Sequence, residues 1–263
     1  MTPPPKRRTR IRLGHVPIDV VTMAETLDDI EAMITSGTGG MVFTPNVDHV
    51  VLADENVRLR EAYQDVTLSL ADGMPILWAS SLLRLPLTHK ISGSDLLLPL
   101  VERASQRGFR VYLLGGADGV GERAAAVLKE KYPSLIVCGI DSPRVGLDDS
   151  AAVRAQQAAR VKEARPDIVF VALGNPKQEL WIHQTFESLK PGVLLGIGAS
   201  LDFVAGVSRR APPWVSRMGL EWLFRLGMEP RRLWRRYLLR DPKFLAILLR
   251  TARRPRRELL IDP

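Results

Sequence analysis

Cysteine, histidine pairs and long apolar runs are scarce in this sequence. The single cysteine, Cys138, excludes a disulfide framework and any zinc site built on cysteine pairs, and it favours a reducing, cytoplasmic location. The four histidines include no pair spaced by three or four residues, so we expect no histidine-based metal site. The best apolar runs, 193–197 and 244–249, are far shorter than the roughly 18–20 residues of a spanning helix. We therefore expect a soluble or membrane-peripheral protein.

Several catalytic signatures are also missing. The chain has no Gly-x-Ser-x-Gly elbow, and the glycines at 196 and 198 lack the third glycine of the dinucleotide fingerprint, which disfavours a nicotinamide enzyme. There is no Asp-x-Asp pair of the kind that would hold a metal on a nucleotide diphosphate. A diphosphate bound here would have to be neutralised by backbone N–H groups, helix N-termini and Lys or Arg side chains, so we expect neither a metal nor a cofactor.

The net charge of +8 is unevenly distributed. Residues 207–263 carry 15 basic and 5 acidic side chains, a net charge of +10, and residues 1–12 carry 5 basic and none acidic. The remaining 17 basic and 24 acidic side chains give residues 13–206 a net charge of −7. Basic ends of this kind indicate binding to nucleic acid or to an anionic membrane surface.

Apolar runs typical of strands alternate with helical patterns along most of the chain. This alternation predicts an α/β fold with a Rossmann-like, mostly parallel sheet between helices. The expected strands include 41–43, 66–70, 109–114, 168–173 and 193–197, and the expected helices include 46–63 and 95–106, the second capped by Ser94. We divide the chain into a disordered basic tail (1–12), an α/β domain (13–206) and an Arg- and Trp-rich helical appendage (207–263).

Polar residues and glycines follow the expected strands at the carboxyl edge of the sheet, where α/β folds bind their ligands. Asp72 follows one strand and could act as a general base, or it could simply cap the next helix. Thr44 follows another strand, and Pro45 biases it towards an extended conformation. Asn46 could face the same cleft or cap a helix, and local sequence leaves these alternatives open.

Two further loops could bind phosphate. Gly115 and Gly116 permit close approach of a ligand to a helix N-terminus, although a plain tight turn explains them as well. After Gly174, the first turn of the next helix brings Lys177, which could offset phosphate charge, and Gln178, which could bind a sugar or an acceptor. A capped helix start with solvated charges is the alternative.

The appendage interleaves tryptophans with arginine pairs such as 231–232 and 235–236. It could be an interfacial membrane anchor, a nucleic-acid patch or a solvated helical face, and the tryptophans favour the membrane.

Seven blocks of the sequence together resemble the bacterial WecG/TagA/CpsF glycosyltransferases. They are Thr44-Pro45-Asn46, Ala71-Asp72-Gly73, 91–96, 112–116, 174–182, 198–206 and 210–232, and the resemblance covers about residues 13–240. It implies a metal-independent, inverting transferase in cell-surface polysaccharide biosynthesis. The enzyme would move N-acetylmannosamine, its uronic acid or a hexose from a UDP-sugar to an undecaprenyl-diphosphate-linked saccharide, on the cytoplasmic face of the membrane.

The resemblance also assigns roles to residues. The family's general base falls on Asp72, its active-site threonine on Thr44 and its catalytic glutamine on Gln178. Arginines that complete the site from the appendage fall among Arg210, Arg217, Arg225, Arg231 and Arg232. The other residues that we assign to substrate binding are Asn46, Lys90, Gly93, Asp95, Gly115, Gly116, Gly174, Asn175, Lys177 and Asp202. Lys90 stands where the family commonly has Arg, so it keeps the charge but loses the two-pronged hydrogen bonding.

We thus expect a UDP-sugar, a lipid-linked acceptor and an anionic membrane surface as partners, and no nucleic acid. The oligomeric state, a homo-oligomer included, stays open. The alternative hypothesis is a non-catalytic protein on the same fold that binds a nucleotide-sugar or a polyanion.

Overall fold

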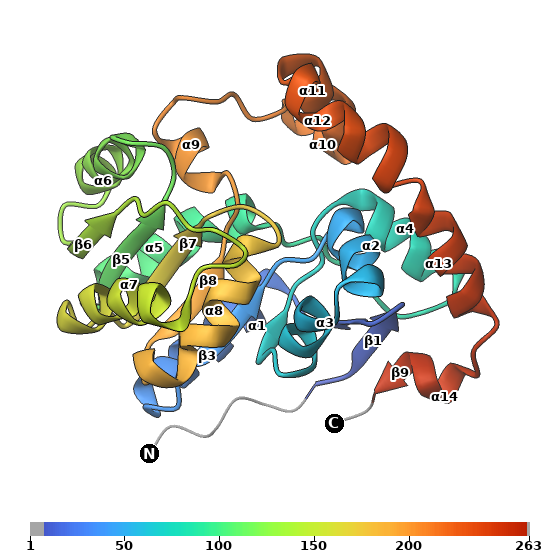
Figure 1. Cartoon of the computed structure of the whole chain (residues 1–263), viewed down its shortest axis with the longest axis horizontal. Coiled ribbons are helices and arrows are strands. Elements are labelled where there is room, and N and C mark those ends of the chain that lie inside the picture. Colours follow the sequence, from blue (N-terminus) through green and yellow to red (C-terminus); the bar gives the residue numbers. More distant parts are fainter. Residues whose placement is uncertain (1–7, 262–263) are drawn as a thin grey trace.

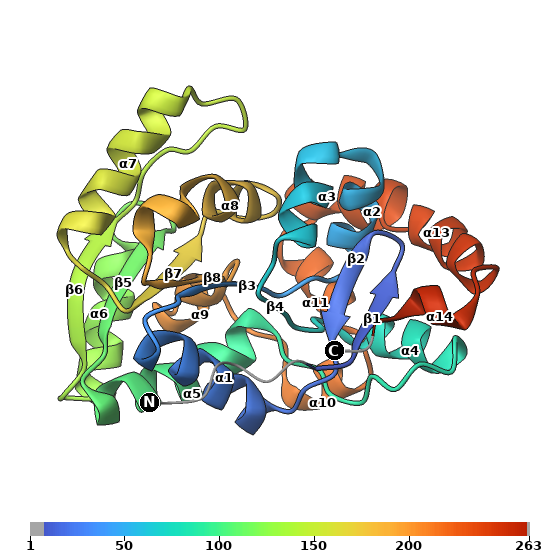
Figure 2. The ribbon, with the colours of Figure 1, turned by 90° about the horizontal axis from the view of Figure 1, so that it is seen from below.

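A parallel sheet forms the centre of the fold in a computed structural model of the protein. The structure describes residues 8–261, apart from the side chains of Pro213 and Arg217. The strands of this sheet are β3 (Gly40–Phe43), β4 (Leu68–Ser69), β5 (Arg110–Gly115), β6 (Ile136–Asp141), β7 (Ile168–Ala172) and β8 (Val193–Gly196). They pair in the order β4-β3-β8-β7-β5-β6, with every pair parallel, and Figure 1 shows the sheet within the molecule while Figure 2 labels all six strands. The predicted α/β fold is confirmed.

Helices cover both faces of this sheet. One face carries α1 (Met23–Thr35), α5 (Gly93–Arg107), α6 (Val120–Lys131) and α9 (Ser200–Val204), and the other carries α2 (Val47–Glu55), α3 (Val57–Gln64), α7 (Ala151–Glu163) and α8 (Lys177–Leu189). Successive side chains of a strand point to opposite faces. In β7, Ile168 and Phe170 therefore pack in one core and Val169 and Val171 in the other, and all four are fully buried. Burial on both faces explains why the strands are continuous apolar runs.

Two expected helices differ in their bounds. The helix expected over 46–63 is divided at Asn56, whose backbone is extended and whose side chain caps α3. The next expected helix begins at Gly93 and is capped by Ser92, not Ser94. Ser92 and Asp95 form a capping box, in which each side chain accepts a hydrogen bond from the other's backbone N–H, at 3.1 and 3.2 Å. No range was predicted for helix α4 (Met74–Leu82), although a capping role for Asp72 would have implied a helix there.

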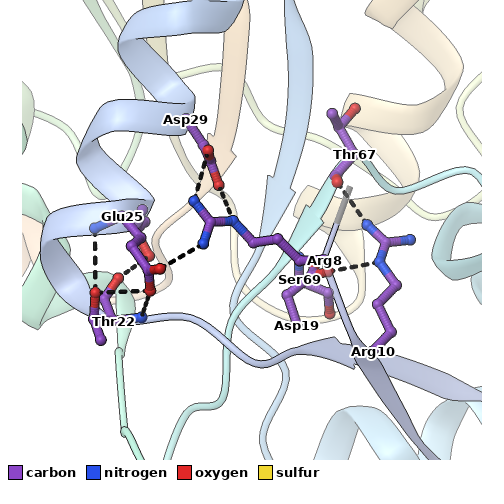
Figure 3. Close-up of polar contacts among 9 residues, drawn as sticks. Arg8, Arg10, Asp19, Thr22, Glu25, Asp29, Thr67 and Ser69 are labelled. Carbon is purple, nitrogen blue, oxygen red and sulfur yellow. Dashed lines mark hydrogen bonds and ion pairs between the residues drawn. The ribbon is translucent and has the colours of Figure 1, made fainter. Parts of the chain in front are cut away.

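A small antiparallel sheet holds the two ends of the described chain. Its strands are β1 (Arg10–Leu13), β2 (Val16–Asp19) and β9 (Leu260–Ile261), in the order β2-β1-β9. Arg8 donates two hydrogen bonds to Asp29, at 2.8 and 3.0 Å, and Arg10 donates to Asp19 and to the Thr67 carbonyl, both at 2.6 Å (Figure 3). These contacts correct the expected disordered tail for residues 8–12, because they order this segment. Residues 1–7 lie outside the described part of the chain.

The C-terminal appendage is a series of short helices. They are α10 (Pro213–Arg217), α11 (Glu221–Met228), α12 (Pro230–Trp234), the π-helix η1 (Arg235–Arg240), α13 (Lys243–Ala252) and α14 (Arg256–Leu259). From α9 the chain crosses to α10 and α11, runs down beside α2 and α4, and returns to β1 through β9 (Figures 1 and 2). Phe244 and Ile247 of α13 are buried in the same core as Ile11 of β1. The appendage is therefore packed into the body of the protein. Between residues 8 and 261, no helix is long and apolar enough to cross a membrane.

Candidate active site

A polar cleft of about 400 Å³ lies at the carboxyl edge of the parallel sheet. The loops after β3, β4, β7 and β8 all contribute to it, because the carboxyl ends of parallel strands meet at one edge. Of the residues assigned from the sequence, the cleft is lined by Thr44, Asn46, Asp72, Gly93, Gly174, Asn175, Gln178, Asp202, Arg225 and Arg232. The structure thus brings ten of the assigned residues, from distant parts of the chain, to one cleft.

Asp72 follows β4 and is free of any capping role. The N-cap of α4 is Gly73, with φ of +92°, and no side chain caps that helix. One oxygen of Asp72 accepts a hydrogen bond from Asn46 Nδ2 at 3.3 Å. Burial raises the pKa of the Asp72 carboxyl above its ordinary value, and the charge of Glu221 adds to this rise, while Lys90 and the Asn46 hydrogen bond oppose it. A half-buried carboxylate with a raised pKa, facing a cleft, suits a general base.

Asn46 fulfils both roles that its sequence position allowed. Its side-chain oxygen accepts a hydrogen bond from the Asp48 backbone N–H at 3.1 Å and caps α2, while its amide nitrogen donates to Asp72. His49 Nδ1 lies 3.2 Å from the Asn46 backbone nitrogen, and Arg236 donates to the Asn46 side-chain oxygen at 3.1 Å. These hydrogen bonds together fix the orientation of the Asn46 amide beside Asp72.

Thr44 and Gln178 hold the loop after β8. The Thr44 hydroxyl donates to the Gly196 carbonyl at 3.1 Å, and Gln178 Oε1 accepts from the Gly198 backbone N–H at 3.0 Å. Gln178 Nε2 donates to Glu179 at 2.7 Å. Glu179 is fully buried, lies 3.2 Å from His49 Nε2, and has one oxygen without a partner among the described residues. A network of buried polar groups thus connects the β8 loop to α2, the helix that Asn46 caps.

Glycines allow close packing at two of these positions. A Cβ on Gly93 would lie 2.8 Å from the Ile197 Cα, so the start of α5 can approach the end of β8 only without a side chain. Gly115 has φ of +102°, and a Cβ there would lie 2.6 Å from the Ala172 carbonyl oxygen. Gly93 lines the cleft, whereas Gly115 and Gly116 lie outside its lining and join β5 to β7.

Four other assigned residues have partners outside the cleft. Lys177 donates to the Val145 carbonyl at 2.8 Å, so its amine is directed at a loop and not at the cleft. Asp95 forms ion pairs with Lys90, at 2.9 Å, and with Arg210. Burial alone would raise the pKa of Asp95, but hydrogen bonds from Arg210, Lys90 and Ser92 outweigh it and hold the pKa at about 2. These ion pairs and hydrogen bonds of Asp95 stabilise the start of α5.

Two of the assigned appendage arginines, Arg225 and Arg232, line the cleft. Arg225 also stacks over the Phe203 ring at 5.8 Å, and Arg232 lines the cleft near Asp202. Burial raises the pKa of Asp202, and the charge of Arg232 opposes that rise. The Arg231 side chain is exposed and is not part of the cleft lining, and the Arg217 side chain lies outside the described residues.

An ion-pair cluster at the cleft was not predicted from the sequence. Asp48 lies 3.2 Å from Arg236 Nε and 2.5 Å from Arg240 Nε, and it accepts a hydrogen bond from Asn175 at 3.0 Å. Burial raises the pKa of the neighbouring Asp241, and the charge of Asp48 adds to the rise. The four-residue spacing of Arg236 and Arg240, which places both on one side of a helical turn, was the available signal. Among residues 8–261, no cluster of three or more His, Cys, Asp or Glu side chains is arranged to hold a metal ion.

A second pocket, of about 300 Å³, adjoins the cleft. The two share Asn46, Asp72, Glu221, Arg225 and Arg236. The second pocket otherwise lies between the start of α4 and the appendage, and its walls are mostly apolar. Asp72 therefore stands where a polar cleft and an apolar pocket meet.

The model of the glycosyl transferase WecG/TagA/CpsF family matches residues 11–258. The chain belongs to this family. A relative from Bacillus spizizenii, named N-acetylglucosaminyldiphosphoundecaprenol N-acetyl-beta-D-mannosaminyltransferase, is 32% identical over 215 residues, which cover 82% of this chain and 80% of the relative. Relatives of the same name from two strains of Staphylococcus aureus are 28% and 29% identical, and each alignment covers 86% of this chain and 87% of the relative.

Membership in the WecG/TagA/CpsF family makes this protein a glycosyltransferase, in agreement with the resemblance seen in the sequence. The match to the family extends from β1 into α14. The family model therefore matches the appendage and its arginines as well as the parallel sheet.

Proposed function

We propose that the protein transfers N-acetylmannosamine from a UDP-sugar to an N-acetylglucosaminyl-diphosphate lipid, with inversion and without a metal ion. The sugar and the acceptor are those in the relatives' printed names. The observation that carries the proposal is the position of Asp72, a carboxylate with a raised pKa at the junction of the polar cleft and the apolar pocket. UDP as the donor's carrier comes from the sequence resemblance.

In this mechanism Asp72 accepts the proton of the acceptor hydroxyl. The hydroxyl oxygen then forms a bond to the anomeric carbon as the bond from that carbon to the UDP phosphate oxygen breaks. Attack from the face opposite UDP inverts the anomeric centre. With a donor whose sugar is α-linked, inversion gives the β-linkage that the relatives' names specify.

Cationic side chains of the cleft would stabilise the departing UDP. Arg225 and Arg232 line the cleft beside the loop at Gly174 and the N-terminus of the 13-residue helix α8. Arginine guanidinium groups bind phosphate oxygens in pairs of hydrogen bonds, and a helix N-terminus presents free N–H groups. These fixed charges and dipoles would act where the negative charge develops.

The test is the turnover of Asp72→Asn with UDP-N-acetylmannosamine and an N-acetylglucosaminyl-diphosphate lipid. Loss of a general base should lower kcat by about 10²–10⁴-fold. The matched control is Asp118→Asn, an exposed aspartate in the turn before α6, which should keep wild-type turnover. Near wild-type activity of Asp72→Asn would refute the base assignment.

A second carboxylate must be tested beside Asp72. Glu221 lines both pockets, but its side chain accepts a hydrogen bond from the Ser216 hydroxyl at 2.9 Å. We therefore expect Glu221→Gln to lose far less activity than Asp72→Asn. If Glu221→Gln loses more activity than Asp72→Asn, Glu221 is the general base.

We also propose that the protein acts while docked on the anionic inner face of the cell membrane. Large exposed apolar side chains gather on α4 and the appendage. Their exposed fractions are 51–72%, and they are Trp78, Leu82, Trp214, Met218, Leu238 and Leu239. These elements lie in the same half of the molecule in both views (Figures 1 and 2). Arginines such as Arg235 flank them, and the combination of aromatic, aliphatic and basic side chains suits an anionic membrane interface.

Vesicle flotation tests this docking. Wild-type protein should float with vesicles containing anionic phosphatidylglycerol, and less with neutral phosphatidylcholine vesicles. The double variant Trp214→Glu/Leu239→Glu should float markedly less. Equal flotation of variant and wild type would contradict the proposed docking surface.

A further inference from the structure

The apolar pocket beside the cleft is built from four separate elements. Its apolar walls come from the start of α4, from α11, from η1 and from α13: Met74, Pro75, Trp222, Tyr237, Phe244 and Leu245. Trp222 and Tyr237 contact each other, with ring centroids 5.8 Å apart. Phe244 is 7% exposed and Leu245 is 64% exposed, so the pocket extends from the core to the protein surface.

The end of the same pocket that adjoins the cleft is charged, because Asp72, Glu221, Arg225 and Arg236 line both. Lys90 and Asp241 also line the pocket, so it contains three cationic and three acidic side chains. A molecule bound from the cleft outward would therefore pass from charged side chains, which include Asp72 and the cations, to apolar walls that reach the surface at Leu245. A molecule with a sugar hydroxyl, a diphosphate and an apolar chain, in that order, complements this sequence of groups.

We propose that this pocket binds the first isoprene units of the lipid diphosphate acceptor, so that the enzyme recognises the lipid as well as the sugar. This inference rests on the proposed function. Three observations carry it: the apolar walls, the cations at the end that adjoins the cleft, and the continuity with Asp72 through residues shared with the cleft. A pocket of about 300 Å³ is at the small end of ligand sites, so it takes only the start of the chain, and the remainder leaves past Leu245.

Leu245 offers a sharp test because the chain contains a matched control. Leu245 and Leu249 lie one turn apart on α13, and both are 64% exposed. Leu245 lines the pocket, whereas Leu249 is not part of its lining. Replacing either with Ser removes the same exposed apolar side chain, but only Leu245→Ser changes the pocket.

The experiment compares two acceptors in buffer without membranes or detergent. Both carry an N-acetylglucosaminyl-diphosphate head, one with three isoprene units and one with a methyl group. Wild-type enzyme should show a higher kcat/KM for the prenylated acceptor. Leu245→Ser should lower this preference by about tenfold, the usual effect of a lost apolar contact in a pocket, with the KM for the UDP-sugar unchanged. Leu249→Ser should keep the wild-type preference.

Inhibition by compounds that lack the sugar tests the order of the groups. Farnesyl diphosphate should compete with the acceptor in the wild type and about tenfold more weakly in Leu245→Ser, whereas farnesol should inhibit poorly. Equal inhibition by farnesol and farnesyl diphosphate would contradict the proposal that the cations bind the diphosphate while the apolar walls bind the isoprene chain.

The remaining outcomes separate this inference from the proposed function. If the wild type transfers sugar to both acceptors with equal kcat/KM, or if Leu245→Ser and Leu249→Ser behave alike, the pocket does not bind the lipid chain. If the wild type transfers sugar to neither acceptor, the proposed function fails and the assignment of the pocket fails with it.

Discussion

The buried ion pairs of Asp48 join the appendage to the helix that begins beside Asn46. The Asp48 side chain is 2% exposed and contacts Arg236, Arg240 and Asn175. In Asp48→Ala, the two guanidinium groups lose their buried partner while they remain in place. We therefore expect this single substitution to loosen the contact between η1 and α2.

The size of the effect follows from burial. Removing one partner of a buried ion pair costs about 3–5 kcal/mol, because the other charge stays buried without compensation. The Arg236 and Arg240 side chains are 20% and 37% exposed, so water relieves part of this cost. We expect Asp48→Ala to lower the free energy of unfolding by about 3 kcal/mol and the Tm by roughly 6–12 °C. Arg240→Ala should cost less, about 1 kcal/mol, because Arg236 still pairs with Asp48.

Urea unfolding followed by far-ultraviolet circular dichroism measures these differences. The control is Asp148→Ala, because Asp148 also pairs with an arginine, Arg58, at 3.3 Å but is 90% exposed. Exposed pairs contribute about 0–1 kcal/mol, so this variant should unfold close to the wild type. If Asp48→Ala unfolds as late as Asp148→Ala, the reasoning about the buried cluster is wrong.

Three further predictions concern pH and packing. Because burial raises the pKa of Asp72, the acidic limb of kcat/KM against pH should lie above the ordinary aspartate value near 3.8, and Asp72→Asn should abolish that limb. The pKa of Asp95 is lowered to about 2 in the folded protein, so its ionised form stabilises the fold above pH 3.8 and this contribution disappears as the pH falls through 2. Asp95→Asn should therefore be less stable than wild type at pH 7 in thermal unfolding, with the gap narrowing in acid. Gly93→Ala should lose about 1–3 kcal/mol in urea unfolding, because its Cβ would contact backbone at 2.8 Å, whereas Gly227→Ala, a helical glycine with nothing within 4 Å, should be neutral or more stable. Equal stability of the two alanine variants would contradict the packing argument.

The alternation of apolar runs and polar loops was enough to predict the sheet and most of its cleft. Strands buried on both faces must be apolar throughout, and parallel strands place their following loops at one edge. This is why Thr44, Asp72 and Gln178, which are far apart in the sequence, could be assigned to one site. The choice between a base and an N-cap for Asp72 needed the structure, because it depends on how the chain turns at Gly73.

The contacts of the appendage could not be predicted in the same way. Arg236 pairs with Asp48, which lies 188 residues earlier in the sequence. The spacing of Arg236 and Arg240 places them together, but nothing in the local sequence indicates that Asp48 is their partner. Helix α4 was missed because its apolar side chains show no helical periodicity, and Trp78 is exposed although it is apolar. The cap of α5 was predicted two residues too late, although Asp95, three residues after Ser92, carries the signal of a capping box.

The return of the chain from the appendage to β1 has a consequence for synthesis. Asp72 and the parallel sheet are translated first, whereas Arg225, Arg236 and the appendage walls of the apolar pocket follow only after about residue 220. Strand β9 then pairs with β1, so the last described residues are positioned by some of the first. A nascent chain can fold its sheet on the ribosome, but it acquires a complete site only when nearly the whole sequence has emerged, and by then the proposed docking surface has emerged as well.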